Sequence, residues 1–396
     1  MKGYNVEACR KLVIRMENIY CDHAATSPVH PDVIKAMQTA LNETFGNPSS
    51  IHSYGRRARH LVDEARQMAA RSIGADFNEI IFTSGGTEAD NLAIIGVALA
   101  NRDKGKHIIT TQIEHHAVLN TCEFLEKEGF DITYLPVDEM GRISLSSLES
   151  ALRDDTILVS IMFGNNEVGT IQPIKEIGEL LSNHRAYFHT DAVQAYGLVN
   201  INVKEMNIDL LSVSAHKING PKGIGFLYVK NGTKLSPLMR GGEQERKRRA
   251  GTENAYAIAG FHKAIEISMA NMNEKVAYYQ QLKQRFVSEL SNQGIEFYIN
   301  GSKEHSLPHI INISFPGTDV EAMLVNLDLA GIAASSGSAC TAGSVEPSHV
   351  LKAMFGSNSD RIYNSIRFSF GYGNTIEQIE KAAKQTANIV QRLLNK

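Results

Sequence analysis

One lysine in this chain of 396 residues stands where its amine could act as a nucleophile. Lys217 follows the apolar segment DLLSVSA and a histidine, and a Gly/Pro-rich turn separates it from a second apolar segment, GIGFLYV. Because burial at a strand end disfavours the charged amine, the neutral form becomes available, as a Schiff-base lysine requires. For an isolated lysine a solvated loop position is more common, and we interpret Lys222 in that way.

The segment FTSGGTEADN predicts a site for an anion. A strand-like run ends at Ser84, two glycines follow, and Thr87 begins a predicted helix. Glycines let backbone N–H groups approach an anion, and the N-terminus of a helix favours negative charge. A phosphate group fits this pattern at Gly86 and Thr87. An ordinary turn in which Thr87 caps the helix is the alternative.

Other polar residues also follow predicted strands. Asp191 ends the segment AYFHTD, Gln194 comes just after it, and His115 follows an earlier strand. An acid at a strand end could pair with a protonated ring nitrogen, although such residues often cap helices. His115 could stack on a flat ring or move protons near neutral pH, although a histidine there is more often structural. Asp191 and Lys217 lie one strand–helix unit apart, so one ring could meet both.

Two segments could recognise a carboxylate. Asn165 and Asn166 follow a strand in FGNNEVGTIQP, where their amides could orient a ligand or simply form a turn. Arg367, within the alternating strand SIRFSF, suits bidentate capture of a carboxylate if it points into a cleft rather than outward. The basic segment GGEQERKRRAGTEN is either a solvated loop or a means of bringing Thr252 to a phosphate.

The segment SSGSACTAGS surrounds Cys340 with small residues only. A loop of this composition has few apolar side chains to pack, so its thiol is expected to be mobile and exposed, whereas cysteine is usually buried. A displayed thiol suggests a nucleophile or a carrier. An unreactive surface cysteine is the alternative.

The elements that must position these residues alternate between strand and helix. Strand-like segments at about 79–84, 106–111, 131–137, 156–163 and 186–191 are separated by helical segments, and the Lys217 stretch closes the series. This α/β pattern predicts a mostly parallel sheet flanked by helices, with ligands at the carboxyl ends of its strands.

After Gly242 the pattern changes. Residues 254–292 are largely helical, as a long helix leaving the first domain would be, and short strands then mix with helices. We predict a large ligand-binding α/β domain over 31–270, a smaller α+β domain from 16–30 and 271–396, and an N-terminal extension over 1–15.

Composition narrows the class of protein. The net charge of −3 gives no basic surface for direct nucleic-acid binding, and no apolar run reaches the roughly 18 residues of a membrane span. The four cysteines are far apart and form no CxxC pair, so we expect neither a disulfide framework nor a metal site. We expect a cytoplasmic protein.

Taken together, the motifs resemble the cysteine desulfurases of the NifS/IscS type, in the class V aminotransferase group of fold-type I pyridoxal-phosphate enzymes. The resemblance runs from about Met16 to the C-terminus, and the motifs occur in order: DHAAT, FGNPSSIH, FTSGGTEADN, IEHHAVL, NNEVGTIQP, HTDAVQA, SAHKINGPKGIG, RRAGTEN, SSGSACTAGS and SIRFSFG. The opening YCDHAAT departs from the more usual YLDNAAT. Cys21 and His23 are therefore unusual, and we assign them no role.

The resemblance implies pyridoxal 5′-phosphate as the cofactor and a homodimer as the assembly. It implies that Lys217 forms the Schiff base, that Asp191 pairs with the pyridine nitrogen, that Gln194 contacts the ring hydroxyl and that His115 stacks on the ring and is a candidate acid/base. The residues implied to hold the phosphate are Gly86, Thr87, Ser214 and His216, with Thr252 supplied by the partner subunit.

The resemblance also implies L-cysteine as the substrate. Asn166 and Arg367 would bind its carboxylate, Lys217 would move the Cα proton, and Cys340 would carry the sulfur as a persulfide. The acceptor would be an iron–sulfur scaffold, whose cluster Cys340 could transiently contact, or a tRNA thiouridylase. Alternatives are a selenocysteine lyase, an aminotransferase or other class V enzyme, or a catalytically degenerate sulfur-relay protein. The thiol argues against transamination, and the Lys217, Asp191 and His115 set argues against degeneracy.

Overall fold

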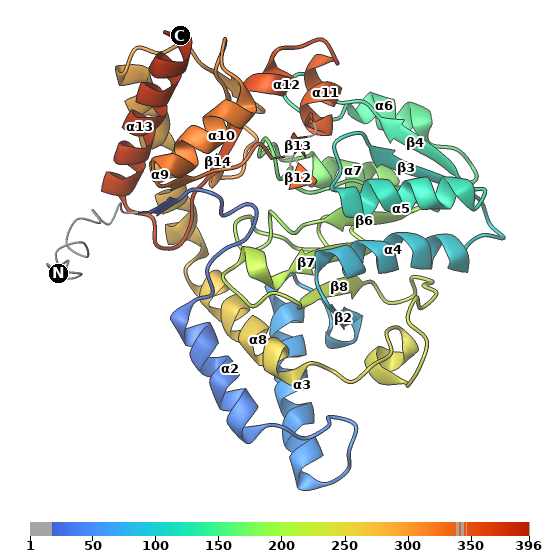
Figure 1. The fold of residues 1–396 in the computed structure, drawn as a ribbon. Coiled ribbons are helices and arrows are strands. Elements are labelled where there is room, and N and C mark those ends of the chain that lie inside the picture. Colours follow the sequence, from blue (N-terminus) through green and yellow to red (C-terminus); the bar gives the residue numbers. More distant parts are fainter. Residues whose placement is uncertain (1–17, 338–339, 342–343, 346, 396) are drawn as a thin grey trace, which may run out of the picture.

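The computed structural model describes residues 18–337, 340–341, 344–345 and 347–395, and Figure 1 gives their arrangement. A seven-stranded sheet in the order β2-β8-β7-β6-β5-β3-β4 forms the centre. Its strands are β2 (Ile80–Thr83), β3 (His107–Thr111), β4 (Asp131–Leu135), β5 (Thr156–Ser160), β6 (Tyr187–Asp191), β7 (Leu210–Ser214) and β8 (Gly225–Val229). β8 runs opposite to the other six strands of this sheet, which are parallel to one another, so the prediction of a mostly parallel sheet is confirmed.

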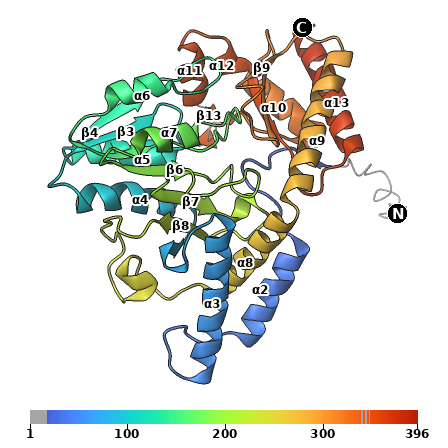
Figure 2. The same cartoon turned by 180° about the vertical axis from the view of Figure 1, so that it is seen from behind.

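Helices cover both faces of this sheet because its strands are apolar on both sides. Ile81, Ile108 and Leu158 pack with α4 (Gly86–Ala100) and α5 (His116–Lys127) in one core cluster. Ile80 and Phe82 face the opposite cluster. The helices of that second layer are α2 (Pro31–Glu43), α3 (Ser53–Ser72), α6 (Leu145–Ala151), α7 (Ile174–Leu181) and α8 (Ala255–Ala270). Figures 1 and 2 agree that α2, α3 and α8 lie side by side.

A smaller unit is built on a three-stranded antiparallel sheet, β14-β10-β9. Its strands are β9 (Tyr298–Asn300), β10 (Ile310–Ser314) and β14 (Ser365–Ser369), and its helices are α9 (Met272–Asn292), α10 (Val320–Leu329), α11 (His349–Phe355), α12 (Arg361–Asn364) and α13 (Ile376–Leu394). Most of them share a separate core cluster. Where one long helix was predicted, α8 and α9 are two helices separated by Asn271.

The N-terminal segment joins the smaller unit. β1 (Ile19–Tyr20) pairs in parallel with β11 (Ile332–Ala333), and Ile19 and Cys21 are buried in the core of that unit. This placement is compatible with the predicted domain boundaries, which stay a prediction. The predicted extension, residues 1–15, lies outside the described residues.

In the described part of the chain, three 3₁₀ turns and a short hairpin complete the elements. The turns are η1 (Phe77–Glu79), η2 (Ala215–Lys217) and η3 (Gln244–Lys247). The hairpin pairs β12 (Cys340–Thr341) with β13 (Ser344–Val345), so the backbone at Cys340 is a short strand rather than the irregular loop that its composition predicts. The side chain of Cys340 lies outside the described part of the chain. No helix of the described residues is long and apolar enough to cross a membrane.

Candidate active site

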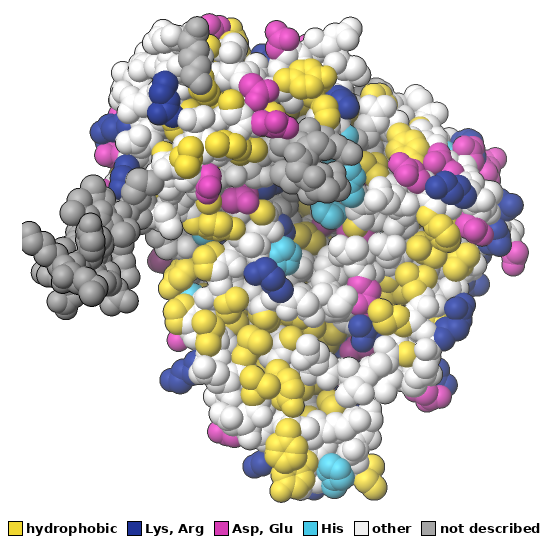
Figure 3. Space-filling model, viewed as in Figure 1, with side chains coloured by type: hydrophobic (Ala, Val, Ile, Leu, Met, Phe, Trp, Pro, Cys, Tyr) yellow, Lys and Arg dark blue, Asp and Glu magenta, His cyan; other side chains and the backbone are white. Residues whose placement is uncertain are grey.

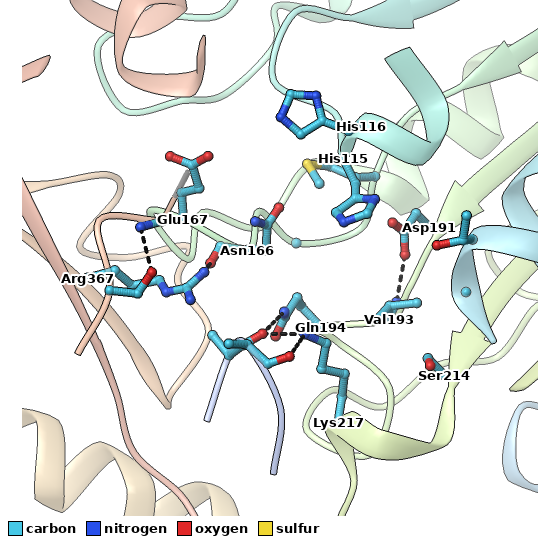
Figure 4. A pocket seen from close by; sticks show the side chains of 18 of the residues that line it. His115, His116, Asn166, Glu167, Asp191, Val193, Gln194, Ser214, Lys217 and Arg367 are labelled. Carbon is cyan, nitrogen blue, oxygen red and sulfur yellow. Dashed lines mark hydrogen bonds between the residues drawn. The ribbon is translucent and has the colours of Figure 1, made fainter. Parts of the chain in front are cut away.

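A cavity of about 370 Å³ lies where several strands of the central sheet end. His115 reaches it from the segment after β3, Asp191 from the end of β6, and Ser214 from the end of β7. The smaller unit closes it with Arg367 of β14, and Ala24 and other residues complete the wall. Figure 4 shows these side chains converging, and Figure 3 shows histidine side chains gathered near the centre of that face. The sheet thus brings together residues far apart in sequence.

Lys217 lies on the turn η2, directly after β7. Its Nζ donates hydrogen bonds to the backbone carbonyls of Ala24 and Ala25, the latter at 2.8 Å. Burial, together with the smaller effect of the Arg367 guanidinium, lowers the pKa of Lys217 to about 7, while Asp191 opposes the shift. The amine is therefore available in its neutral form near neutral pH.

Asp191 is a buried acid facing the same space. Its Oδ1 accepts a hydrogen bond from the backbone N–H of Val193 at 2.9 Å. Burial raises the pKa of Asp191, whereas the neighbouring His115 and Lys217 lower it. A buried carboxylate is stable as an anion only beside a cation, so this position favours a ligand that presents a protonated nitrogen.

His115 precedes α5 and caps it. Its Nδ1 accepts a hydrogen bond from the backbone N–H of Ala117 at 3.1 Å, which assigns the ring proton to Nε2. Desolvation in the cavity lowers the pKa of His115, with Asp191 opposing and Lys217 adding to the shift. A neutral imidazole therefore points into the cavity, where Figure 4 shows it on the same side as Asp191.

The start of α4 provides a site for an anion. The helix begins after Gly85 without a side-chain cap, and Gly85 has φ of 148°, a conformation that suits glycine. Gly86, Thr87, Ser214 and His216 all line the cavity there. Burial lowers the pKa of His216 to about 4, so this histidine contributes a neutral ring. Uncapped N–H groups at a helix N-terminus are a common phosphate site.

Arg367, from β14, and Asn166, from the segment after β5, line the same cavity. Arg367 donates from Nη1 to the Asn166 carbonyl at 2.9 Å and from Nη2 to Asp22 Oδ1 at 2.8 Å. Its Nε has no hydrogen-bond partner among the described residues. Each terminal nitrogen also carries a second N–H, through which a guanidinium can bind a carboxylate. Asp22 was missed by the sequence analysis, although it stands in the DHAAT motif.

Gln194 is held in place by two contacts. Its Nε2 donates to the Ala24 carbonyl at 2.9 Å, and its Oε1 accepts from His309 Nε2 at 3.3 Å. Lys217 Nζ donates to the same carbonyl, so Gln194 lies beside Lys217. Its predicted contact with a ring hydroxyl stays a prediction.

Thr252 does not line this cavity. It is exposed and lines a second hollow, together with Ser84 and Gly223. Thr252 therefore lies outside the cavity of its own chain. Its predicted role in the site of a partner subunit stays a prediction.

Three further titratable side chains, those of Glu167, His116 and His349, line the cavity without having been predicted as site residues. Glu167 is buried, accepts a hydrogen bond from Ser348 Oγ, and has its pKa raised by burial. The rings of His116 and His349 lie 4.8 Å apart near it. His116 and Glu167 lie in motifs where the adjacent residues His115 and Asn166 were predicted to act. No sequence pattern indicated His349. Among the described residues, no group of His, Cys, Asp or Glu could hold a metal ion.

The class of protein follows from comparison with known families. The family model of the class-V aminotransferases matches residues 19–382, and the chain belongs to this family. Enzymes of this family depend on pyridoxal 5′-phosphate.

The names of individual relatives indicate a more specific activity than the family name does. The chain is similar to "Putative cysteine desulfurase IscS 1" of Bacillus subtilis (strain 168), with 64% identity over 96% of this chain and 100% of the relative. It is 50% identical to "Cysteine desulfurase IscS" of Methanosarcina thermophila, over 98% and 96% of the two chains. A solved structure titled "NIFS-LIKE PROTEIN" superimposes with a TM-score of 0.88 at 36% identity, covering 95% of this chain and all of the other.

The residues present fit the family's cofactor. Asp191 is a buried acid that a protonated ring nitrogen would stabilise, and Lys217 Nζ lies in the same cavity with a pKa of about 7. The uncapped start of α4 is suited to a phosphate. Each of these features matches one chemical group of pyridoxal 5′-phosphate.

Proposed function

We propose that this chain is a cysteine desulfurase that uses pyridoxal 5′-phosphate to convert L-cysteine into L-alanine and a persulfide on Cys340. The observation that carries the proposal is that Lys217, Asp191 and Arg367 line one cavity. A reactive amine, an acid for a ring nitrogen and a guanidinium for a carboxylate are the groups that this cofactor and an amino-acid substrate need. The names of the relatives support the same activity.

In this proposal Lys217 would hold the cofactor covalently. Asp191 would pair with its ring nitrogen, Gln194 would contact its ring hydroxyl, and His115 would stack on the ring. When bound, the cofactor supplies an electron sink for negative charge at the substrate Cα. The groups that hold its phosphate stand at the start of α4 and the end of β7, and they are Gly86, Thr87, Ser214 and His216.

The side chains divide the remaining chemistry. Arg367 and Asn166 bind and orient the substrate carboxylate, and Lys217 Nζ takes the proton from Cα. The Cys340 thiolate attacks the substrate sulfur, so that an S–S bond forms, the Cβ–S bond breaks and its electron pair stays on carbon. Protonation of that carbon, with His115 as a candidate proton donor, and return of the proton from Lys217 Nζ to Cα give alanine. Ser335 and Gly337 line the cavity, so the segment that carries Cys340 leaves from its edge.

The thiol assignment is tested by Cys340→Ser. We expect this variant to lose persulfide formation and sulfur release from L-cysteine while keeping the cofactor absorbance. Cys122→Ser is the matched control, because Cys122 is a buried free thiol in α5 with its pKa raised by burial to about 12. Sulfur release by Cys340→Ser at the wild-type rate, measured with a thiol-trapping reagent and alanine detection, would refute the assignment.

A homodimer is part of the proposal. Apolar side chains are exposed on α2, α3 and the turn between them, where Figure 3 shows hydrophobic groups at the lower end of the molecule: Ile34, Leu41, Phe45, Ile51 and Tyr54. Exposed apolar clusters of this kind often mark an interface. Thr252, exposed on its own chain, would then serve the phosphate of the partner subunit's site.

The sulfur acceptor is an iron–sulfur scaffold protein or a tRNA thiouridylase, in the cytoplasm. Both accept sulfur from the same persulfide. Loading the enzyme with ³⁵S-cysteine and adding each acceptor separately distinguishes them, because label moves only to the true partner. Transfer to neither protein would contradict this part of the proposal.

A further inference from the structure

A second, much smaller cavity shares Lys217 with the active site. Its volume is about 20 Å³, and the large and small units both contribute to its wall. His23, His309 and Lys275 line it together with Lys217. A single water needs roughly 10–15 Å³, so the space is sufficient for one water molecule.

Two buried ring nitrogens border this cavity. Nδ1 of His23 and Nδ1 of His309 have no hydrogen-bond partner among the described residues. The two residues are 5% and 6% exposed, so bulk solvent does not satisfy these atoms. A buried polar atom without a partner is costly. Gly371 leaves the space open, because a Cβ at that position would lie 2.2 Å from His23 Nδ1.

A chain of hydrogen bonds leads from these histidines to the reactive lysine. His309 Nε2 lies 3.3 Å from Gln194 Oε1 and must donate to it, because that oxygen is an acceptor. His309 Nδ1 is therefore the unprotonated nitrogen. Gln194 Nε2 donates to the Ala24 carbonyl at 2.9 Å, and the same carbonyl accepts from Lys217 Nζ.

Burial keeps both imidazoles neutral. Burial lowers the pKa of His309 well below its ordinary value, and His23, Lys283, Lys217 and Lys275 add to this shift. Burial also lowers the pKa of His23 to about 4. A neutral imidazole has one nitrogen that accepts a hydrogen bond, and a water molecule can donate a hydrogen bond to that nitrogen.

The charged groups facing Lys217 come from three places. They are Arg367 of β14, Asp191 of β6 and Asp22 of the segment after β1. Neither histidine acts on Lys217 as a charge. Their influence must pass through hydrogen bonds.

We propose that one buried water bridges Nδ1 of His23 and Nδ1 of His309, and that both histidines are positioning residues that hold Gln194 beside Lys217. The inference rests on the proposed function because Gln194 is there assigned to the ring hydroxyl of the cofactor. It also gives a role to His23, which stands where the usual family motif has asparagine.

The direct test is a high-resolution crystal structure of the holoenzyme. We expect one ordered water within hydrogen-bond distance of both Nδ1 atoms. An empty cavity, or a water that contacts neither ring, would overturn the proposal whatever the activity of the enzyme.

The second test reads the cofactor spectrum of His309→Leu and His23→Asn. Without the His309 bond, Gln194 no longer donates reliably to the ring hydroxyl, so negative charge there holds the proton on the lysine-linked nitrogen more strongly. We expect the pH midpoint of the visible absorption band to rise by roughly half a unit in His309→Leu and by less in His23→Asn.

The matched control is His107→Asn. His107 is also buried, but its ring bonds to Thr156 and Thr133 at the start of β3, at the opposite end of the strand from the site. An unchanged midpoint in both test variants, or an equal shift in His107→Asn, would contradict the positioning role. If His309→Leu does not fold, His23→Asn and the crystal structure decide. Failure of the proposed function is separate, because it would appear as a visible band retained by Lys217→Ala.

Discussion

At the residue scale, Lys217 illustrates what surroundings add to a side chain. Sequence position alone could not separate it from an ordinary loop lysine, and Lys222 lies only five residues further on. In the structure the Lys217 amine donates hydrogen bonds to two backbone carbonyls inside a cavity, whereas Lys222 is exposed. The difference between the two amines arises from burial and from neighbours distant in the chain.

This contrast gives a first prediction. Lys217→Ala is expected to abolish the visible absorbance of the lysine-bound cofactor and the desulfurase activity, while far-UV circular dichroism stays unchanged. Lys222→Ala is the matched control and should keep both. Absorbance spectra of the two purified variants make the comparison, and a normal band in Lys217→Ala would exclude covalent attachment at that residue.

The pKa of Lys217 also predicts how stability depends on pH in the cofactor-free protein. The folded pKa of about 7 lies below the ordinary value of 10.5, so between these values the unfolded chain binds the extra proton. The cost of burying the charge is therefore complete below pH 7 and disappears as pH rises from 7 toward 10.5.

Urea unfolding of wild type and Lys217→Met measures this effect. We expect the difference in unfolding free energy to favour Lys217→Met at pH 6.5 and to shrink steadily up to pH 9.5. A difference that stays constant over this range would mean that the amine is not desolvated in the folded protein.

At the element scale, turns between elements shape the site as much as the strands do. The turn before α4 depends on Gly85, whose φ of 148° is unfavourable for other residues. The neighbouring strand also restricts it, since a Cβ on Gly225 would lie 2.9 Å from the Gly85 Cα. The sequence marked this turn because two adjacent glycines directly before a predicted helix are typical of a backbone that approaches an anion.

Gly85→Ala is predicted to weaken cofactor binding. A shifted backbone would turn an N–H group away from the phosphate, and loss of a hydrogen bond to a charged group corresponds to roughly a tenfold or greater rise in Kd. Gly223→Ala is the control, because Gly223 also has positive φ, 79°, but a Cβ added there would meet no non-neighbouring atom within 4 Å. Both variants should lose about 1–2 kcal/mol of stability, and only Gly85→Ala should lose affinity.

A buried ion pair fixes the loop that carries Thr252. Arg66 of α3 donates from both terminal nitrogens to Glu245 at 2.6 and 2.8 Å, and both side chains are buried. Three successive residues of that loop, Glu245, Arg246 and Lys247, have positive φ without being glycine. Such backbone persists only where surrounding contacts enforce it.

Glu245→Gln is therefore expected to be strongly destabilising. Removing one partner leaves a buried guanidinium without its charge partner, which costs about 3–5 kcal/mol. Glu266→Gln, which breaks the more exposed Lys263–Glu266 pair, should cost less than about 1 kcal/mol. Equal effects of the two variants in chemical denaturation would contradict the special role of the Arg66–Glu245 pair.

At the scale of the whole molecule, the site is shared between units and, in our proposal, between subunits. A mixed dimer separates the two possibilities for Thr252. One subunit carries Lys217→Ala and the other carries Thr252→Glu, whose carboxylate would repel the cofactor phosphate. If Thr252 serves the partner subunit's site, one of the two sites keeps both native residues.

We expect the co-purified mixed dimer to show activity that neither parent homodimer has. The measurement is alanine production per dimer, with tandem affinity tags ensuring that only mixed dimers are assayed. If Thr252 served its own subunit, both sites would be damaged and the mixed dimer would be as inactive as its parents.

The sheet and the residues at its strand ends could be predicted because their signals are local. Alternating apolar segments predicted the central strands, and Asp191 and His115 were recognised because each follows one of them. The contacts of Asp22 and His309 could not be predicted in this way. Both join segments more than 100 residues apart, through pairing that no local pattern specifies. The exposure of Thr252 likewise could not be predicted, because it depends on how the loop that carries it packs.

The pairing of the first described residues with the last strands has a consequence for the order of biosynthesis. Ala24 supplies a carbonyl to Lys217, yet its own N–H donates to Ser369 of β14 at 2.8 Å, and Cys21 is bonded to Ala333 and Ser369. On a translating ribosome these early residues must wait for β14, because Ser369 is made 345 residues after Ala24. The carbonyl partners of the reactive lysine are thus fixed only once β14 is available, which delays assembly of the site behind synthesis of the strands that carry its other residues.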